Sequence, residues 1–455
     1  PARHGGPARA GPRPVLMGSI RAPETQRRAP LRRGVTGLSA AVMPAVVPAL
    51  AAAVAAAALA ATVLLHVRHP DALVTLLPST DMYELHVDFD TFWQSAVALV
   101  HGADLYETPA KLTNLNPPVL SVLLVPFAAL DALTAYRLFA VLTLVLVAVA
   151  IVAVARELRL GPWVSVAAVT AVLASSPLHG TLVLGQIYGL LLVGLVAGWI
   201  AERRGHPALA ACCYGITVAL KPSLAPILLL ALAQRRWVPF RTGIAAAAVT
   251  TLAGMLVAGP TATWEWFTIA LTEAVPGVEA NASLPGLAAR FGVPTPAGSA
   301  VGLLLLVGTL LWCARHRQEI DPAGTAPWAV LAAALLFSPI AWHNYLLLLM
   351  PGALIVAAQG RRLVAAALLA ASLVPVSWGS EWAPDEAVPL SLYSAILLGW
   401  WLVLLATARS GAQLPSGTSQ STPDGGSRSV ADADRPCQEA FSATTVPRFP
   451  TPEPP

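Results

Sequence analysis

Long apolar runs fill the middle of the chain, and short segments that contain arginine separate them. A helix needs roughly 20 mostly apolar residues to cross a bilayer, and only 11% of the residues here are charged, against about 25% in a soluble domain. Backbone polar groups are satisfied in lipid only within helices or closed barrels, and the alternating pattern of barrel strands is not seen. The sequence therefore predicts an all-α integral membrane protein with about 12 transmembrane helices.

Both ends of the chain differ from this apolar middle. Residues 1–36 are rich in Arg, Pro and Gly, and residues 409–455 are rich in Ser, Thr, Pro and Asp. Such compositions do not bury enough apolar surface to fold, so both segments are predicted to be disordered tails. The polytopic membrane domain is expected at residues 37–408. Its first apolar run, 43–66, is too long for the core of a signal peptide and is interpreted as a span.

The arginines and lysines between the apolar runs predict how the chain crosses the membrane. The candidate spans are residues 43–66, 137–155, 163–178, 186–201, 207–220, 222–234, 242–259, 299–315, 325–340, 343–358, 361–378 and 389–408. With the N-terminus in the cytoplasm, roughly twelve of these cations fall in inside loops and about five in outside loops, as the positive-inside rule requires. We therefore expect a multi-pass plasma-membrane protein with both termini on the cytoplasmic side.

The first external loop is predicted to be long, at residues 67–136. Pro117–Leu130 is apolar enough to span the membrane, but counting it as a span would place Arg156 and Arg159 outside. It is therefore interpreted as a helix that lies along the outer membrane face or dips into it. A second helical piece is expected near residues 90–101.

The segment 207–234 holds a lysine in an unusual place. Its two halves are short helices of roughly 20 Å each, and Lys221-Pro222 lies where they meet. A lysine at this depth is costly without a partner. Lys221 either reaches the interface with its long side chain or awaits a membrane-embedded anion such as a lipid phosphate.

Several other polar residues fall on the outer side in this topology. Asp88 and Asp90 lie just before an amphipathic stretch, and a carboxylate at the membrane surface can be a general base for a hydroxyl, although a solvated loop carboxylate is the simpler interpretation. The remaining outward-facing candidates are Gln186, Asn281, Arg290, His343, Asn344 and Tyr345. An acid, a lysine, an arginine and a histidine on one face form a pattern that suits a phosphate-linked substrate.

Cofactor signals are missing from the sequence. Cys212, Cys213, Cys313 and Cys437 lack metal-ligand spacing, and no Gly-rich nucleotide loop is seen. No cofactor and no metal site are expected, although the acidic loop residues leave a divalent ion open. The formal charge of +4 reflects arginine-rich tails and loops and not a nucleic-acid surface.

The order of five motifs resembles a known family. They are DFDTFWQSAVALVHGADLY (88–106), NPPVLSVLLVPFAAL (116–130), HGTLVLGQIYGLLL (179–192), ALKPSLAPILLLALAQRRW (219–237) and SPIAWHNYLLLLMPG (338–352). Together they resemble glycosyltransferase family 87, membrane mannosyltransferases of the GT-C superfamily. Asn116 stands where an aromatic residue is common, and Tyr188 where asparagine is common. These two departures leave the acceptor and the identity of the sugar open.

This resemblance implies a GT-C fold and a hexosyltransferase that moves mannose from polyprenyl-phosphate-mannose to a glycolipid or glycan acceptor outside the plasma membrane, by a single inverting displacement that gives an α-linkage. It assigns Asp88 as the general base, with Asp90 as the alternative. Lys221 is implied to hold the donor phosphate, which Arg290 or His343 would neutralise further. Gln186 and Tyr345, together with Asn344, are expected at the sugar and acceptor site.

Two other functions stay open at this point. A related transferase could use another polyprenyl-linked sugar, such as arabinofuranose, with the same motifs. A polytopic transporter would place its polar groups near the bilayer midplane and often shows paired repeats. No two-half symmetry is obvious here, and the long acidic first loop favours an enzyme.

Overall fold

The computed structural model describes residues 36–68, 79–272, 281–375 and 391–409. Within these ranges the chain is helical and contains no strand, apart from one isolated bridge between Asn281 and Trp342. The prediction of an all-α protein is confirmed for this part of the chain. The two tails predicted to be disordered lie outside the described residues, apart from a residue at each inner boundary.

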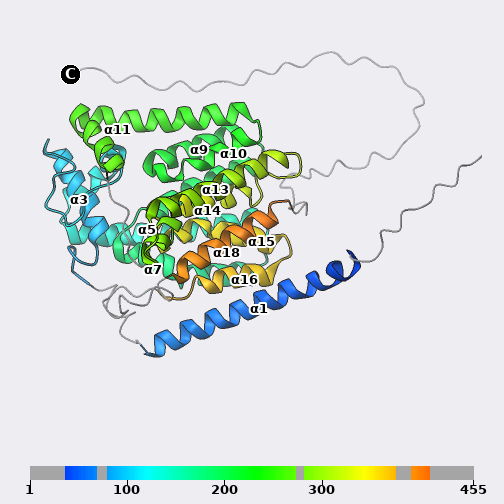
Figure 1. The fold of residues 1–455 in the computed structure, drawn as a ribbon. Coiled ribbons are helices and arrows are strands. Elements are labelled where there is room, and N and C mark those ends of the chain that lie inside the picture. Colours follow the sequence, from blue (N-terminus) through cyan, green and yellow to red (C-terminus); the bar gives the residue numbers. More distant parts are fainter. Residues whose placement is uncertain (1–35, 69–78, 273–280, 376–390, 410–455) are drawn as a thin grey trace, which may run out of the picture. The chain divides into compact units, whose positions relative to one another are not determined.

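The described ranges fold into a series of helices (Figure 1). In the first half of the chain they are α1 (Thr36–Arg68), α3 (Val87–Val100), α4 (Pro118–Leu124), η1 (Val125–Ala129), α5 (Ala132–Glu157), α6 (Pro162–Leu173), α7 (Ser176–Leu184), α8 (Tyr188–Arg203) and α9 (Pro207–Leu220). In the second half they are η2 (Pro222–Leu224), α10 (Pro226–Ala233), α11 (Trp237–Thr272), α12 (Leu284–Arg290), α13 (Thr295–Arg315), α14 (Ala326–Phe337), η3 (His343–Leu349), α15 (Met350–Ala358), α16 (Arg362–Ala371) and α18 (Leu392–Thr407).

The predicted number of spans is not confirmed. In the described residues, four helices are long and apolar enough to cross a membrane, namely the Val46–Leu64 part of α1, α5, α11 and α13, and a bent pair of helices raises this to five. Most of the other predicted spans are apolar helices of only 10–17 residues. A helix of that length covers about 15–26 Å, which is less than the hydrocarbon core of roughly 30 Å.

Local chain breakers explain where the helices differ from the predicted spans. The predicted span 163–178 is broken between α6 and α7, which meet at 46°, and Ser175 caps α7 by accepting a hydrogen bond from the Leu178 backbone N–H. The predicted span 242–259 is part of a longer helix, α11, which is interrupted at Gly259 with φ 89°. A left-handed glycine followed by Pro260 breaks the hydrogen-bond ladder of a helix.

The predicted helical pieces of the first loop and of segment 207–234 are present. Helices α3 and α4 with η1 occupy the loop segments where helices were expected. Likewise, α9 ends at Leu220 with Lys221 as its C-cap residue, and η2 and α10 follow. The helix stops there because Pro222 disfavours helical geometry in the preceding residue.

The core of the described chain lies among the short helices. Helix α14 is buried along its length up to Leu336 and packs against α10, α13 and α18. The long helices carry far more exposed apolar surface, since only 11% of the most apolar window of α11 is buried. This distribution is that of a bundle whose outer helices face lipid.

Helices α9 and α11 lie side by side (Figure 1) and approach closely at glycine. A Cβ atom added at Gly215 of α9 would lie 2.3 Å from the backbone oxygen of Gly243 in α11. Replacing Gly215 by Ala is therefore expected to destabilise the protein by about 1–3 kcal/mol, because the two helices must move apart. The measurement is the thermal unfolding midpoint in detergent.

Gly308 of α13 is the matched control for this substitution. It is an exposed helical glycine with no atom within 4 Å of an added Cβ. Gly308→Ala is expected to keep or raise the midpoint, since alanine is favoured over glycine in helices by about 0.5–1 kcal/mol. Equal shifts for the two variants would contradict the close approach of α9 and α11.

Candidate active site

Gly185 brings the end of α7 against the start of α3. It caps α7 in the left-handed region with φ 74°, which glycine adopts without strain. A Cβ atom at this position would lie only 2.3 Å from the Cβ of Phe89. This contact places the next residue, Gln186, beside Asp88, and the Gln186 Nε2 donates a hydrogen bond of 2.7 Å to the Asp88 Oδ2.

Asp88 occupies a half-buried position in the first turn of α3. Burial raises the pKa of its carboxyl from 3.8 to about 6, and the Gln186 hydrogen bond and the positive charge of Lys221 oppose that rise. The N-terminus of a helix also favours a negative charge. A carboxylate with this pKa is ionised at neutral pH and is a better proton acceptor than an ordinary aspartate.

Asp90, the alternative base, lies two residues further along α3. Residues at this spacing point to different sides of a helix. The Asp90 side chain is buried, its pKa is raised by that burial, and its described partner is Gln94 of the same helix. The structure therefore separates the two candidate carboxylates, and Asp88 is the one that contacts Gln186.

Lys221 lies at the C-terminal end of α9, where the helix stops before Pro222. Its Nζ donates a hydrogen bond of 3.2 Å to the Asn116 Oδ1, and Asn116 is itself buried and hydrogen-bonded to Asn114. The ammonium group also lies 5.8 Å from the centre of the Tyr345 ring, within the range of a cation–π contact. Among the described residues its hydrogen-bond partner is a neutral amide, so its positive charge is available to an anion.

Two buried tyrosines connect the Asp88 side of this group with the Lys221 side. The rings of Tyr188 and Tyr345 pack with their centroids 4.5 Å apart. Tyr345 carries the Lys221 ammonium over its face, and Tyr188 lies near Asp88. We call Asp88, Asn116, Gln186, Tyr188, Lys221 and Tyr345 the acid–lysine cluster.

The sequence prediction identified four members of this cluster as site residues, namely Asp88, Gln186, Lys221 and Tyr345. It treated Asn116 and Tyr188 only as departures from the family's motifs. Tyr188 lies two residues from Gln186 in the same motif, and Asn116 is the first residue of the motif at 116–130. These positions within the motifs are the signal that marks both residues as functional candidates.

The contacts of Arg290 differ from those expected of a free phosphate ligand. Its Nη1 donates to the Asn281 backbone oxygen at 2.7 Å, and its Nη2 donates to the Ser394 Oγ at 2.7 Å. Its Nε donates to the Ser391 Oγ at 3.1 Å. Arg290 thus ties the end of α12 to the start of α18, and its role at a phosphate stays a prediction.

His343 and Asn344 begin η3 and are fully buried. The ring of His343 packs edge-on against the Tyr393 ring, with the centroids 5.2 Å apart. The amide of Asn344 has no hydrogen-bond partner among the described residues. Both lie within two residues of Tyr345, and the roles predicted for them are not tested by these contacts.

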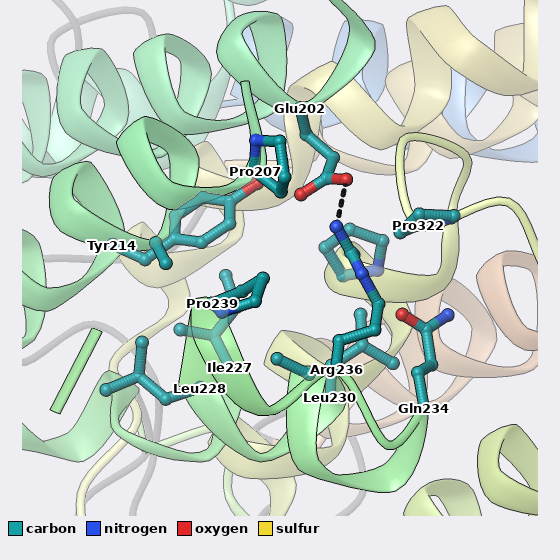
Figure 2. A pocket seen from close by; sticks show the side chains of 13 residues that line it. Glu202, Pro207, Tyr214, Ile227, Leu228, Leu230, Gln234, Arg236, Pro239 and Pro322 are labelled. Atoms are coloured by element: carbon teal, nitrogen blue, oxygen red, sulfur yellow. Dashed lines mark hydrogen bonds and ion pairs between the residues drawn. The ribbon is translucent and has the colours of Figure 1, made fainter. Parts of the chain in front are cut away.

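A separate cavity lies at the other ends of α8 and α9 (Figure 2). It is lined by Glu202, Tyr214, Gln234, Arg236 and apolar residues, and Arg236 pairs with Glu202 across it. Its volume is about 30 Å³, enough for a water molecule or two but not for a sugar. Helix α8 begins at Tyr188 and helix α9 ends before Lys221, so this cavity and the acid–lysine cluster lie at opposite ends of the same helices.

Comparison with known proteins identifies the sequence family of the chain. The model of glycosyltransferase family 87 matches residues 114–339, a range that includes Asn116, Gln186, Tyr188 and Lys221. No solved structure matches the chain.

Curated relatives carry two kinds of transferase name. The chain is 28% identical to a polyprenol-phosphate-mannose-dependent alpha-(1-2)-phosphatidylinositol mannoside mannosyltransferase of Mycobacterium tuberculosis, over 69% of this chain and 79% of the relative. It is 26% identical to an alpha-(1->3)-arabinofuranosyltransferase of Corynebacterium glutamicum, over 70% of this chain and 79% of the relative. With its apolar helical fold, the chain is a membrane glycosyltransferase that belongs to glycosyltransferase family 87.

Proposed function

We propose that this glycosyltransferase moves mannose from polyprenyl-phosphate-mannose to a glycolipid or cell-envelope glycan on the outer side of the plasma membrane. The observation that carries the proposal is the acid–lysine cluster, in which a carboxylate and an ammonium group flank one buried tyrosine pair. The polyprenol-phosphate-mannose-dependent relatives of Mycobacterium tuberculosis and Mycolicibacterium smegmatis support the choice of donor.

The chemistry assigned to the cluster is a single displacement at the anomeric carbon. An acceptor hydroxyl attacks that carbon while its proton passes to the Asp88 carboxylate. The bond between the anomeric carbon and the phosphate oxygen breaks, and the negative charge that develops on the phosphate is stabilised by Lys221. A single displacement inverts the configuration, so a β-linked donor gives an α-linked product.

Each member of the cluster has a place in this step. Gln186 holds the carboxylate through its N–H group, and Asn116 holds the ammonium group through its side-chain oxygen. The Tyr188–Tyr345 pair would pack against the apolar face of a sugar held between Asp88 and Lys221. The roles predicted for Arg290 and His343 would add positive charge or a donor at the phosphate.

Arabinofuranose is the second candidate sugar. The relatives include arabinofuranosyltransferases of Corynebacterium glutamicum and Mycolicibacterium smegmatis, at 26% identity each. A polyprenyl-phosphate donor of either sugar presents the same leaving group, so Asp88 and Lys221 serve both equally well. The choice between the two sugars therefore depends on the residues between these groups.

The test supplies wild-type protein in membranes with radiolabelled polyprenyl-phosphate-mannose or polyprenyl-phosphate-arabinofuranose and a mixed glycolipid extract as acceptor. We expect label in the glycolipid fraction from the mannose donor. Label from the arabinofuranose donor alone would contradict the proposed sugar and keep the reaction type. Label from neither donor, with folded protein, would contradict transferase activity from polyprenyl phosphates.

A further inference from the structure

Only one end of the Gln186 side-chain amide has a hydrogen-bond partner in the described part of the chain. Its side chain is only 3% exposed, and its Nε2 donates to Asp88. Its Oε1 is buried and accepts no hydrogen bond from the described residues. Buried acceptors in folded proteins are nearly always paired, with protein groups or ordered water, because leaving one unpaired is costly. The Oε1 atom is therefore an open acceptor beside Asp88, for a donor group of a ligand or for a water that such a group displaces.

The orientation of this amide is fixed by its surroundings. An ionised carboxylate only accepts hydrogen bonds, so the NH₂ end of Gln186 must face Asp88 and the carbonyl end must face away from it. The backbone is fixed as well, because Gly185 packs on Phe89 and the Gln186 backbone N–H donates to the Thr181 oxygen at 2.9 Å. The unpaired Gln186 Oε1 therefore lies on the side of the amide group that faces away from the Asp88 carboxylate.

The atom that binds at Asp88 in the proposed reaction is a hydroxyl oxygen. In a sugar, the neighbouring hydroxyl is attached one carbon–carbon bond away. The carboxylate of Asp88 and the carbonyl of Gln186 are themselves adjacent, because the amide N–H links them. Two adjacent acceptors of this kind match two adjacent hydroxyl donors, whereas an isolated hydroxyl would leave the Gln186 Oε1 unpaired.

We infer that Gln186 Oε1 accepts a hydrogen bond from the hydroxyl next to the one that Asp88 deprotonates, so that the enzyme recognises its acceptor as a vicinal diol. This inference rests on the proposed function and specifies the acceptor class of the same site. The reacting hydroxyl loses its proton to Asp88. The neighbouring hydroxyl keeps its proton and serves only in binding.

The test combines acceptor analogues with a variant. The acceptors are octyl α-mannoside and its monodeoxy analogues, and the variant is Gln186→Met, which keeps the length of the side chain and removes its polar atoms. With wild type, one analogue is expected to be inactive because it lacks the reacting hydroxyl. A second analogue, lacking the neighbouring hydroxyl, is expected to lose about 10- to 100-fold in kcat/KM, since it leaves the Gln186 oxygen unpaired.

In Gln186→Met this second penalty is expected to disappear, because the variant has no acceptor left to satisfy. Gln359→Met is the matched control, since the Gln359 Oε1 is also buried without a partner in the described residues but lies just beyond the C-terminal end of α15. It is expected to keep the full penalty. If Gln186→Met turns over too slowly for kinetics, the comparison is made by calorimetric binding. Two ligands are compared, the analogue that lacks only the reacting hydroxyl and the analogue that lacks both hydroxyls. Wild type is expected to bind the second more weakly than the first, and Gln186→Met is expected to bind both alike.

The outcomes separate this inference from the proposed function. In one outcome, wild type transfers sugar and yet loses the same factor in kcat/KM as Gln186→Met with the analogue that lacks the neighbouring hydroxyl. That result overturns the vicinal-diol inference alone. A wild type that uses neither lipid-linked donor overturns the proposed function and the inference together.

Discussion

Replacing Asp88 by Asn is expected to lower kcat/KM for sugar transfer by about 10²–10⁴-fold, the usual contribution of a general base. The asparagine keeps the size of the side chain but cannot accept the proton of the attacking hydroxyl. It also changes the hydrogen bond with Gln186, whose NH₂ group now faces a neutral partner. The measurement is the initial rate with saturating lipid-linked donor, in detergent-purified protein whose thermal midpoint matches that of wild type.

The pH profile provides an independent check on this assignment. The base must be ionised, and burial raises the pKa of Asp88 to about 6. The kcat/KM of wild type is therefore expected to be constant above that pH and to fall as the pH drops through it. Removing the positive charge of Lys221 should raise the pH at which kcat/KM falls, because that charge favours the ionised form of the Asp88 carboxylate.

Asp90→Asn is the control for both experiments. Asp90 shares the helix of Asp88 and is buried, but its described partner is Gln94 and not the cluster. Its kcat/KM and pH profile are expected to stay close to those of wild type. Loss of activity in Asp90→Asn with an active Asp88→Asn would reverse the assignment of the base.

Replacing Lys221 by Met is expected to lower kcat/KM by about 10²–10³-fold, similar to the loss of one preorganised group that stabilises developing charge. The methionine keeps the apolar stem and removes the ammonium group that Asn116 and the Tyr345 ring hold in place. In a partly buried site little solvent competes for the phosphate charge, so the effect should be larger than for a surface lysine. Steady-state rates at varied donor concentration measure it.

Two further lysine variants sharpen this prediction. Lys111 is exposed and pairs with Glu84 in the first loop, and Lys111→Met is expected to leave transfer unchanged. Lys221→Arg is expected to recover activity only partly, because a planar guanidinium does not replace a compact point charge. Full activity in Lys221→Met would show that another cation, such as Arg290, holds the phosphate.

The sequence by itself determined the class of the protein and the local positions of its helices. Few charges and long apolar runs leave helix in lipid as the main solution, and proline and glycine mark where many of the helices stop. The two short helices that meet at Lys221 and the helical pieces of the first loop were predicted on this basis and are present. These are local properties, because they depend on residues within a few turns of one another.

Only the tertiary structure decided which residues form the site and how they pair. Gln186 meets Asp88 across 98 residues, and Lys221 meets Asn116 across 105, and no local pattern specifies such contacts. Asn116 and Tyr188 enter the cluster because of packing, and Arg290 is drawn into the α12–α18 junction by hydrogen bonds to the serines of the α18 start. The predicted spans also divided into long and short helices for a tertiary reason, since buried segments such as α14 are covered by other helices and need not match the bilayer.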